Sequence, residues 1–254
     1  MTESTAPKFE TWFDALSKRC NQDLTFREIR KSLQALSQVY VQRRDKLSRG
    51  AALDTRGKRT AFSLFYAPIH YLFVEALLTE LDPNQSPIDT IVDLGCGTGV
   101  AGAAWAMHTL AHPTIQGFDL NRWAVSEARW TYRTLGLQGT AKESDARKVT
   151  LPGRGGALVA SYTINELPDK TRASLLRRIC EAVDSGMSLL IIEPIAKSPV
   201  PWWTEWAEVI TEHGGHEATW QVPLDLPDEI RRLDKAARMH HDRLKGRTLW
   251  VGPR

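Results

Sequence analysis

The chain has 254 residues, 42% of them hydrophobic and 25% charged, which is ordinary for a soluble globular protein. This length fits one large α/β domain or a core with a smaller appendage. No apolar run approaches the roughly 18 residues that a bilayer span requires, and the N-terminal stretch lacks the apolar core of a signal peptide. We therefore expect a cytoplasmic protein with no membrane association.

The three cysteines are scattered along the chain, at Cys20, Cys96 and Cys180, with no C-x-x-C pair. This spacing indicates neither a disulfide framework nor a metal or iron–sulfur site. We therefore expect no bound metal and a reducing compartment.

The net charge of +3 conceals a strong division along the chain. Residues 18–59 hold 12 Lys and Arg against 4 Asp and Glu, and residues 231–254 hold 8 against 2. Residues 60–230 hold 12 against 21. An acidic core between two basic segments suits a polyanionic partner such as RNA. Basic helix faces that are merely solvated have the same composition, so this pattern leaves both interpretations open.

Helical patterns open the chain. Apolar side chains recur at helical spacing within residues 9–50, which predicts a helix there. A second helix is predicted over residues 62–81, with a bend at Pro68. Residues 82–87, with the sequence DPNQSP, have the composition of a linker.

From residue 88 onward, short apolar runs alternate with helical patterns, which is typical of a largely parallel sheet. The predicted fold is α/β, with a doubly wound, mostly parallel, seven-stranded Rossmann-like sheet behind a helical N-terminal module. The predicted domains are a helical substrate or lid module at residues 1–85 and a sheet domain at residues 86–254. Strands are predicted at residues 88–94, 114–120, 139–145, 157–162, 188–194, 218–222 and 248–252. Helices are predicted at about residues 99–111, 121–135, 169–184, 201–213 and 227–241.

The sequence VDLGCGTGVAG, residues 92–102, supports two interpretations. Read from Gly97, it matches the G-x-G-x-x-G loop of dinucleotide-binding proteins. Read from Asp93, it places a carboxylate two residues before the first glycine. A carboxylate at a strand end would repel a pyrophosphate but would suit a cationic ligand that carries an amino acid, either through water or by bracing the loop amides. Asp119, at the end of the second predicted strand, serves either scheme by accepting hydrogen bonds from ribose hydroxyls.

Four segments in order, VDLGCGTG, GFDLN, ESDA and SYTINELPD, resemble the successive motifs of class I S-adenosylmethionine (SAM)-dependent methyltransferases. The resemblance covers about residues 88–195 and implies SAM as cofactor and S-adenosylhomocysteine (SAH) as product. It places the glycine loop beneath the methionine moiety, Asp119 at the ribose, and Asp145 with Ala146 at the adenine. The implied cofactor-binding residues are Asp93, Gly95, Gly97, Gly99, Asp119, Leu120, Asp145, Ala146 and Ser161.

A closer resemblance is carried by the segment before the first motif, together with VASYTINELPDKTRASLLRRI and LLIIEP. These segments are similar to methyltransferase-like proteins associated with the small ribosomal subunit of mitochondria, and to their bacterial relatives. The resemblance implies a helical N-terminal region and a link to ribosomal RNA or to subunit assembly. This sequence departs from the mitochondrial members in lacking their clustered cysteines, so it does not support a metal cluster.

Methyl transfer from a sulfonium is an in-line displacement, so the protein must chiefly align acceptor, methyl group and leaving sulfur. Residues after the fourth predicted strand should lie nearest the methyl group. Among them, Glu166 is the candidate general base and Tyr162 the candidate for orienting the acceptor. Glu166 also fits a structural role as a helix-N-terminal acid. The Asn/Asp-Pro-Pro-aromatic tetrad of amine and amide methyltransferases is absent from the sequence, which disfavours exocyclic amines without choosing among oxygen, carbon and ring nitrogen.

Several basic and aromatic residues are predicted to meet the acceptor. The tryptophans of PWWTEW follow the fifth predicted strand, where a flat acceptor could stack on them. Tryptophans at helical spacing also serve as packing residues, so both roles stay open. The predicted substrate-binding residues are Arg43, Arg44, Lys58, Arg59, Tyr66, Trp202 and Trp203.

The motifs and the charge division favour a SAM-dependent methyltransferase that acts on RNA, with ribosomal RNA or the ribosomal subunit as the preferred partner. A methyltransferase for a small metabolite, with the helical module as a lid, is a second hypothesis. A SAM-binding ribosome assembly factor without catalysis is a third. Asp93 disfavours a dehydrogenase.

Overall fold

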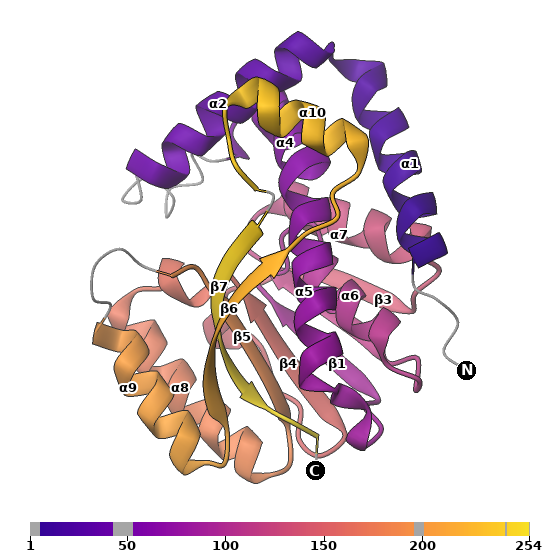
Figure 1. Ribbon diagram of the computed structural model, residues 1–254. Helices are drawn as coiled ribbons and strands as arrows, with labels where there is room; N and C mark the ends of the chain where they lie inside the picture. The colour runs from indigo at the N-terminus through magenta and orange to yellow at the C-terminus, as the bar shows by residue number, and fades with distance from the viewer. Residues whose placement is uncertain (1–5, 43–52, 196–200, 242, 254) are drawn as a thin grey trace.

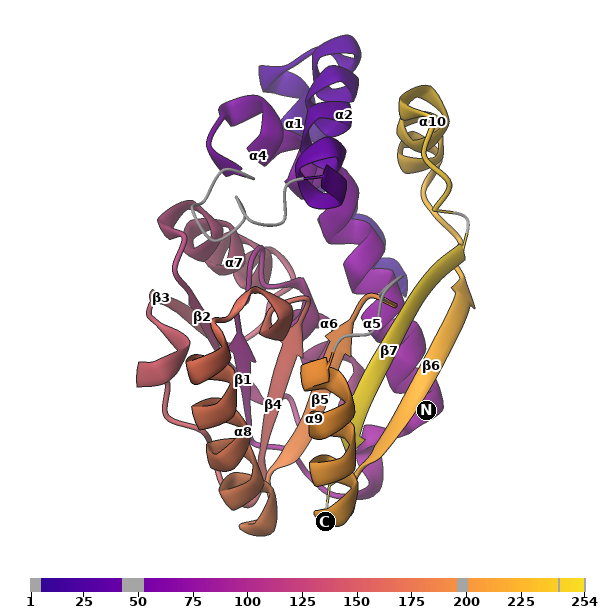
Figure 2. The same ribbon diagram turned by 90° about the vertical axis from the view of Figure 1, so that its left-hand side faces the viewer.

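The computed structural model describes residues 6–42, 53–195, 201–241 and 243–253. A central sheet carries helices on both faces, and a group of helices lies over one end of it (Figure 1). In the second view, α8 and α9 cover the near face of the sheet, and α5 and α6 lie behind it (Figure 2).

Seven strands form one sheet in the order β3-β2-β1-β4-β5-β7-β6. The first five in this order are parallel, and β7 runs antiparallel to both β5 and β6. The strand order reverses between β1 and β4, which is where ligands bind in open parallel sheets. The predicted mostly parallel, seven-stranded α/β fold is confirmed. The strands are β1 (Thr90–Leu94), β2 (Thr114–Asp119), β3 (Gly139–Glu143), β4 (Gly156–Ser161), β5 (Ser188–Glu193), β6 (His216–Pro223) and β7 (Arg243–Val251).

Burial on both faces explains the continuous apolar runs of the central strands. Every residue of β5 is buried, and so is every residue of β4 except Ser161. The edge strand β6 instead alternates between exposed and half-buried residues. This contrast is typical of parallel strands covered by helices beside an edge strand covered on one face.

The helices that connect the strands begin and end near their predicted limits. Asn121 caps α7, because its Oδ1 accepts hydrogen bonds from the backbone N of Trp123 at 3.0 Å and of Ala124 at 3.4 Å. α8 begins directly after Pro168, as predicted. These helices are α6 (Val100–His108), α7 (Arg122–Thr134), α8 (Asp169–Asp184) and α9 (Pro201–Glu212).

The single helix predicted over residues 9–50 is wrong, because α1 (Ala6–Asp23) ends and α2 (Phe26–Gln42) begins within it. The break is a capping box at Thr25 and Glu28. The Glu28 carboxylate accepts from the backbone N of Thr25 at 2.8 Å, and the Glu28 N donates to Thr25 Oγ1 at 3.4 Å. The T-x-x-E pattern was present in the sequence, but the apolar periodicity runs through it.

The helix that follows is continuous but changes its winding. α4 (Arg56–Ala61) passes through a π-helical turn, Phe62–Tyr66, into α5 (Ala67–Leu81). Pro68, where the sequence predicts a bend, lies in the first turn of α5, two residues after this π-helical turn ends. The combined helix is long and apolar enough to cross a bilayer by length and composition, but 67% of its apolar window is buried inside the protein. The combined helix is therefore a core helix of the fold.

α10 (Asp228–Ala237) packs against α2, although about 190 residues separate them in the sequence. Ser17 and Asn21 of α1 donate hydrogen bonds to the Glu229 carboxylate, the latter at 2.7 Å. The Arg232 guanidinium lies 5.5 Å from the Phe26 ring centre. We call α1, α2, α4 and α10 the helical cap (Figure 1). One apolar core joins the cap to α5, α6 and the sheet. The predicted division into two domains at residue 85 stays a prediction.

Candidate active site

The candidate site lies at the carboxyl ends of β1, β2, β4 and β5, below the helical cap. The start of α7, which follows β2, contacts α4 and the π-helical turn. The Trp123 ring packs edge-on against Phe62 at 6.4 Å between ring centres, and the Arg59 guanidinium lies 5.8 Å from the same tryptophan. The cap is therefore on the side of the sheet where ligands bind.

The glycine loop after β1 needs glycine for two different reasons. Gly95 has φ +66°, and a Cβ there would lie 2.3 Å from the side chain of Thr163, so the turn after β4 presses directly against it. Gly97 has φ +52°, and a Cβ there would meet nothing within 4 Å. Only glycine adopts such a φ without strain. The space above Gly97 is therefore open for a ligand to approach the backbone.

Asp93 is buried, with 1% of its surface exposed, and does not face this open space. Its Oδ2 accepts a hydrogen bond from the backbone N of Gly102 at 2.9 Å. A Cβ on Gly102 would meet that same oxygen at 2.9 Å, so the glycine permits the close approach of α6 to β1. Burial raises the pKa of Asp93 to about 7. Of the two roles left open by the sequence, this geometry matches bracing of the loop and the first turn of α6.

Asp119 connects the end of β2 to the glycine loop. Its Oδ2 accepts from the backbone N of Gly97 at 2.9 Å, and its Oδ1 accepts from the N of Asn121 at 2.7 Å. Burial raises the pKa of Asp119. The next residue, Leu120, is 69% exposed although it is large and apolar. A carboxylate beside an exposed apolar side chain suits a ribose joined to a flat base.

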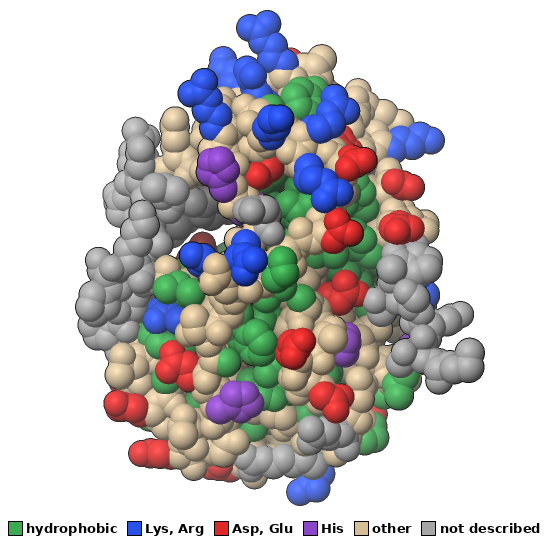
Figure 3. All heavy atoms as spheres, in the orientation of Figure 1, with side chains coloured by type: hydrophobic (Ala, Val, Ile, Leu, Met, Phe, Trp, Pro, Cys, Tyr) green, Lys and Arg blue, Asp and Glu red, His purple; other side chains and the backbone are tan. Residues whose placement is uncertain are grey.

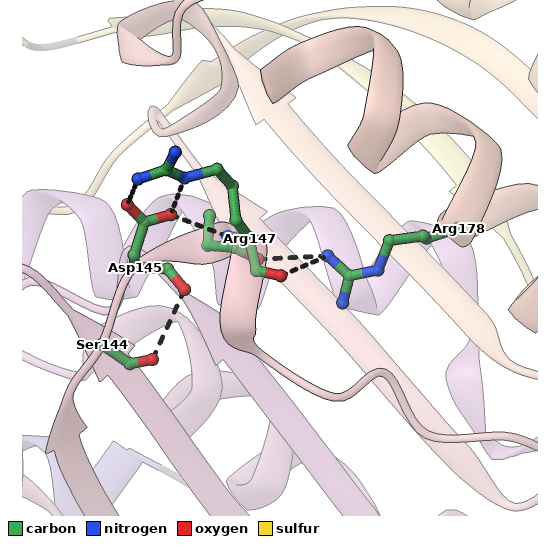
Figure 4. A network of polar contacts seen from close by, with 5 residues as sticks. Ser144, Asp145, Arg147 and Arg178 are labelled. Carbon is green, nitrogen blue, oxygen red and sulfur yellow. Dashed lines mark hydrogen bonds and ion pairs between the residues drawn. The ribbon is translucent and has the colours of Figure 1, made fainter. Parts of the chain in front are cut away.

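Asp145 is already paired. Its two carboxylate oxygens accept from Arg147 Nε at 2.9 Å and Nη2 at 2.7 Å, and Oδ1 also accepts from the Arg147 backbone N (Figure 4). The hydrogen bonds from Arg147 lower the pKa of Asp145 to about 2. Arg178 holds the same turn through the carbonyl of Ala146 at 3.2 Å. The Asp145 carboxylate that is predicted to contact adenine is therefore held by Arg147, and Arg178 holds the backbone of the same turn.

The turn after β4 is strained. Tyr162 has φ +57°, which is uncommon for a residue with a large side chain. Its ring lies against that of His70 on α5, with 4.5 Å between ring centres. Burial lowers the pKa of His70 to about 4, so this imidazole is neutral at pH 7. The Oγ of Ser161 is buried and has no hydrogen-bond partner among the described residues. A strained residue beside an unsatisfied hydroxyl is typical of a binding site.

Two glutamates meet at this turn. Glu166, the predicted base, keeps an exposed surface, yet the surrounding protein and the charge of Asp119 raise its pKa to about 7. Glu193, at the end of β5, is 1% exposed, and its Oε1 accepts from the backbone N of Asn165 at 3.0 Å. Burial raises the pKa of Glu193 to about 7, and the charge of Glu166 contributes. Sequence reasoning missed Glu193, although an acid ending a fully apolar strand was a usable signal.

The tryptophans after β5 differ from the prediction. Trp203 is 3% exposed: the Arg247 guanidinium lies 4.1 Å from its ring centre, and its Nε1 donates to Glu217 at 2.6 Å. It packs in the core between the sheet and α9, so its interpretation as a stacking wall for the acceptor is wrong. Trp202 is half-buried and donates from Nε1 to Asn165 Oδ1 at 3.3 Å, which leaves it beside the turn after β4.

Of the other predicted substrate-binding residues, Lys58 and Arg59 lie in α4 of the cap and Tyr66 ends the π-helical turn. Lys58 pairs with Asp54 at 2.9 Å, and Arg59 donates from Nε to the Leu53 carbonyl at 2.7 Å. Tyr66 is half-buried, and burial raises its pKa to about 12. Arg43 and Arg44 lie outside the described residues.

The site fits SAM in three respects. The open space at Gly97 lets a ligand approach the loop amides. Leu120 offers an exposed apolar surface next to the acid at the end of β2. The carboxylates that line the site favour a cation over a phosphate. Within the described residues, no group of three or more His, Cys, Asp and Glu side chains could hold a metal ion.

Residues 91–186 match the family model described as a methyltransferase domain. A human protein named tRNA (uracil-5-)-methyltransferase homolog B is 31% identical over 96 residues, which are 37% of this chain and 18% of that protein. The chain therefore spans 18% of the length of this curated relative.

Solved structures show the same fold. Magnesium protoporphyrin IX methyltransferase from Synechocystis PCC 6803, with bound SAM, has a TM-score of 0.50 and 13% identity, over 86% of this chain and 95% of that one. Mitomycin 7-O-methyltransferase has a TM-score of 0.50 and 14% identity, over 95% and 72%. Residues 91–186 therefore match a methyltransferase domain, and the chain shares its fold with methyltransferases of known structure.

Proposed function

We propose that this protein transfers a methyl group from SAM to RNA, with ribosomal RNA as the preferred substrate and the cytoplasm as its location. One observation carries the choice of RNA: folding brings parts of the two basic segments, in α2 and α10, together in one helical cap on the ligand side of the sheet. The relative that matches part of this chain is itself named as a tRNA methyltransferase homologue, which supports an RNA acceptor.

Several basic side chains of the cap are exposed. Lys and Arg gather on the upper face over α2 and α10, whereas an apolar patch and scattered acidic side chains lie on the lower face (Figure 3). A surface of this kind neutralises phosphates and orients a nucleic acid without reading its bases. The exposed basic residues described in α1, α2 and α10 include Lys18, Arg27, Lys31, Arg231, Arg232 and Lys235.

The geometry divides the work of methyl transfer among the chain's own residues. When bound, SAM supplies a methyl group on a positively charged sulfur. The glycine loop and Asp119 hold the cofactor at the ends of β1 and β2, and the turn after β4 presents Tyr162 and Glu166 to the acceptor. Alignment of reactants in this manner can contribute roughly 7–11 kcal/mol in the limit.

The test is transfer of labelled methyl groups from SAM into fractionated cell extract, scored as RNA, protein or metabolite. We expect label in RNA, and ribosomal RNA in particular. Label only in metabolites would favour the small-molecule hypothesis. SAH binding without any transfer, to free RNA or to ribosomal subunits, would favour a non-catalytic assembly factor.

Two sets of charge-reversal substitutions, one on the cap and one elsewhere on the surface, test the role of the cap in RNA binding. Four reversals on the cap should weaken RNA binding and flatten its salt dependence by about 0.7–0.9 in log–log slope for each lost phosphate contact. Four reversals elsewhere on the surface should leave both unchanged. Equal effects of the two sets would contradict a specific role for the cap. The cap set is Arg27→Glu, Lys31→Glu, Arg232→Glu and Lys235→Glu, and the control set is Arg133→Glu, Lys142→Glu, Arg154→Glu and Arg177→Glu.

A further inference from the structure

We propose that the acceptor atom is a proton-bearing nitrogen or oxygen, not a pyrimidine carbon, that Glu166 removes its proton, and that Glu193 positions Glu166. The inference rests on the proposed methyl transfer and names the class of atom that receives the methyl group.

The cysteines argue against a carbon acceptor. A pyrimidine ring carbon is a poor nucleophile, and its methylation requires a second nucleophile to add to the ring first; a thiolate is the side chain best suited to this step. All three cysteines of the chain are buried: Cys20 in α1, Cys96 in the glycine loop and Cys180 in α8. Burial raises the pKa of Cys96 and of Cys180, which disfavours the thiolate.

The serine hydroxyl at the turn lacks activation. Ser161 Oγ has no hydrogen-bond partner among the described residues, so no base holds its proton there. An unactivated serine is a weak nucleophile at neutral pH. Covalent activation of a pyrimidine ring therefore has no suitable group at this site among the residues that the structure describes.

Glu166 is placed to accept a proton. It ends the short 3₁₀ turn Ile164–Glu166 that follows β4, and its side chain keeps access to solvent at the carboxyl edge of the sheet. The charge of Asp119 raises the pKa of Glu166, and the charge of Glu166 in turn raises the pKa of Glu193, while Asp169 and Arg172 on the following helix are paired with each other. A carboxylate whose pKa lies near 7 is well matched to general base catalysis at neutral pH.

Glu193 acts through the backbone. Its Oε1 accepts from the N of Asn165, the residue before Glu166, at 3.0 Å. It is fully buried, and Arg247 is its cross-strand neighbour on β7. Trp202 holds the side chain of the same asparagine from the other direction, at 3.3 Å. Glu193 is therefore a positioning residue for the turn that carries Glu166.

The step balances. The acceptor nitrogen or oxygen donates an electron pair to the methyl carbon, the carbon–sulfur bond breaks, and its electron pair stays on sulfur, so SAM becomes neutral SAH. The acceptor's proton moves to the Glu166 carboxylate and is then released to solvent. No oxidant, reductant or added nucleophile is required.

The experiment first identifies the methylated atom by nuclease digestion and mass spectrometry of the labelled product. A methyl group on nitrogen or oxygen supports the proposal, and a methyl group on a pyrimidine carbon overturns it even when RNA is the acceptor. If the label is found in a metabolite instead, the RNA assignment fails, but the same analysis of that metabolite still decides the acceptor atom. RNA that contains 5-fluoropyrimidines should form no covalent adduct with the protein; an adduct would overturn the proposal.

Variants then test the two glutamates. Glu166→Gln should lower kcat by about 100-fold or more, abolish the rise of kcat as pH increases through about 7, and leave SAH affinity unchanged. Glu193→Gln keeps an oxygen that can accept from the Asn165 N–H and should retain the wild-type rise of kcat with pH. Glu193→Ala removes this acceptor and should lower kcat without changing the KM for SAM, whereas a purely structural Glu193 would change stability without this selective loss of kcat. Glu181→Gln, on an exposed part of α8, is the control. If Glu166→Gln kept the wild-type dependence of kcat on pH, Glu166 would not be the general base.

Discussion

Replacing Gly97 by alanine should separate cofactor binding from folding. The backbone at Gly97 has φ +52°, and a residue with a Cβ pays about 1–2 kcal/mol in the left-handed region. The added methyl group meets no protein atom within 4 Å, so no packing cost is added. The expected loss of stability is therefore about 1–2 kcal/mol, which lowers the Tm by about 2–4 °C per kcal/mol in a protein of this size. The variant keeps the N–H that donates to Asp119.

The methyl group would, however, occupy the space through which a ligand reaches the loop. We expect SAH affinity, measured by calorimetry, to fall at least tenfold, which corresponds to about 1.4 kcal/mol. Gly136→Ala is a matched control, because Gly136 has φ +70° and open space around it but follows α7 away from the site. It should lose similar stability and bind SAH normally. Wild-type SAH affinity in Gly97→Ala would refute the placement of the cofactor over this loop.

Three further variants test neighbouring features. Asp119→Ala should weaken SAH binding at least tenfold and cost about 1–3 kcal/mol of stability, because the partly buried amide of Gly97 loses its acceptor; calorimetry and urea unfolding measure the two effects. Asp93→Asn should gain stability relative to wild type as pH rises from about 4 to about 7: the folded-state pKa of Asp93 is raised to about 7, so the wild type loses stability over that window and the variant does not. A constant difference in Tm between pH 5 and pH 8 would argue against this. Arg19→Ala, which breaks an ion pair from α1 to Glu127 on α7, should lower stability by about 1–3 kcal/mol without changing SAH affinity.

Local patterns were sufficient for most of the fold. The apolar runs of the strands, the cap at Asn121 and the start of α8 after Pro168 lie where the sequence predicts them, because strand and helix periodicities are set by near neighbours in the chain. The break between α1 and α2 was missed, since hydrophobic spacing continued across the Thr25–Glu28 capping box. The tryptophans after β5 show the same limit: helical spacing alone did not distinguish the buried Trp203 from the half-buried Trp202.

The sequence by itself determined the order of the elements, the glycine loop with its acids, and through their resemblance the cofactor. Only the tertiary structure decided which distant segments meet. It joins the basic segments of α2 and α10, and it brings Glu193 under the turn that carries Glu166. It also turns Asp93 inward onto Gly102. Such contacts depend on how buried surfaces fit across the whole chain, and no local spacing encodes them. The cofactor could therefore be inferred from the sequence, whereas the acceptor class rests on the fold.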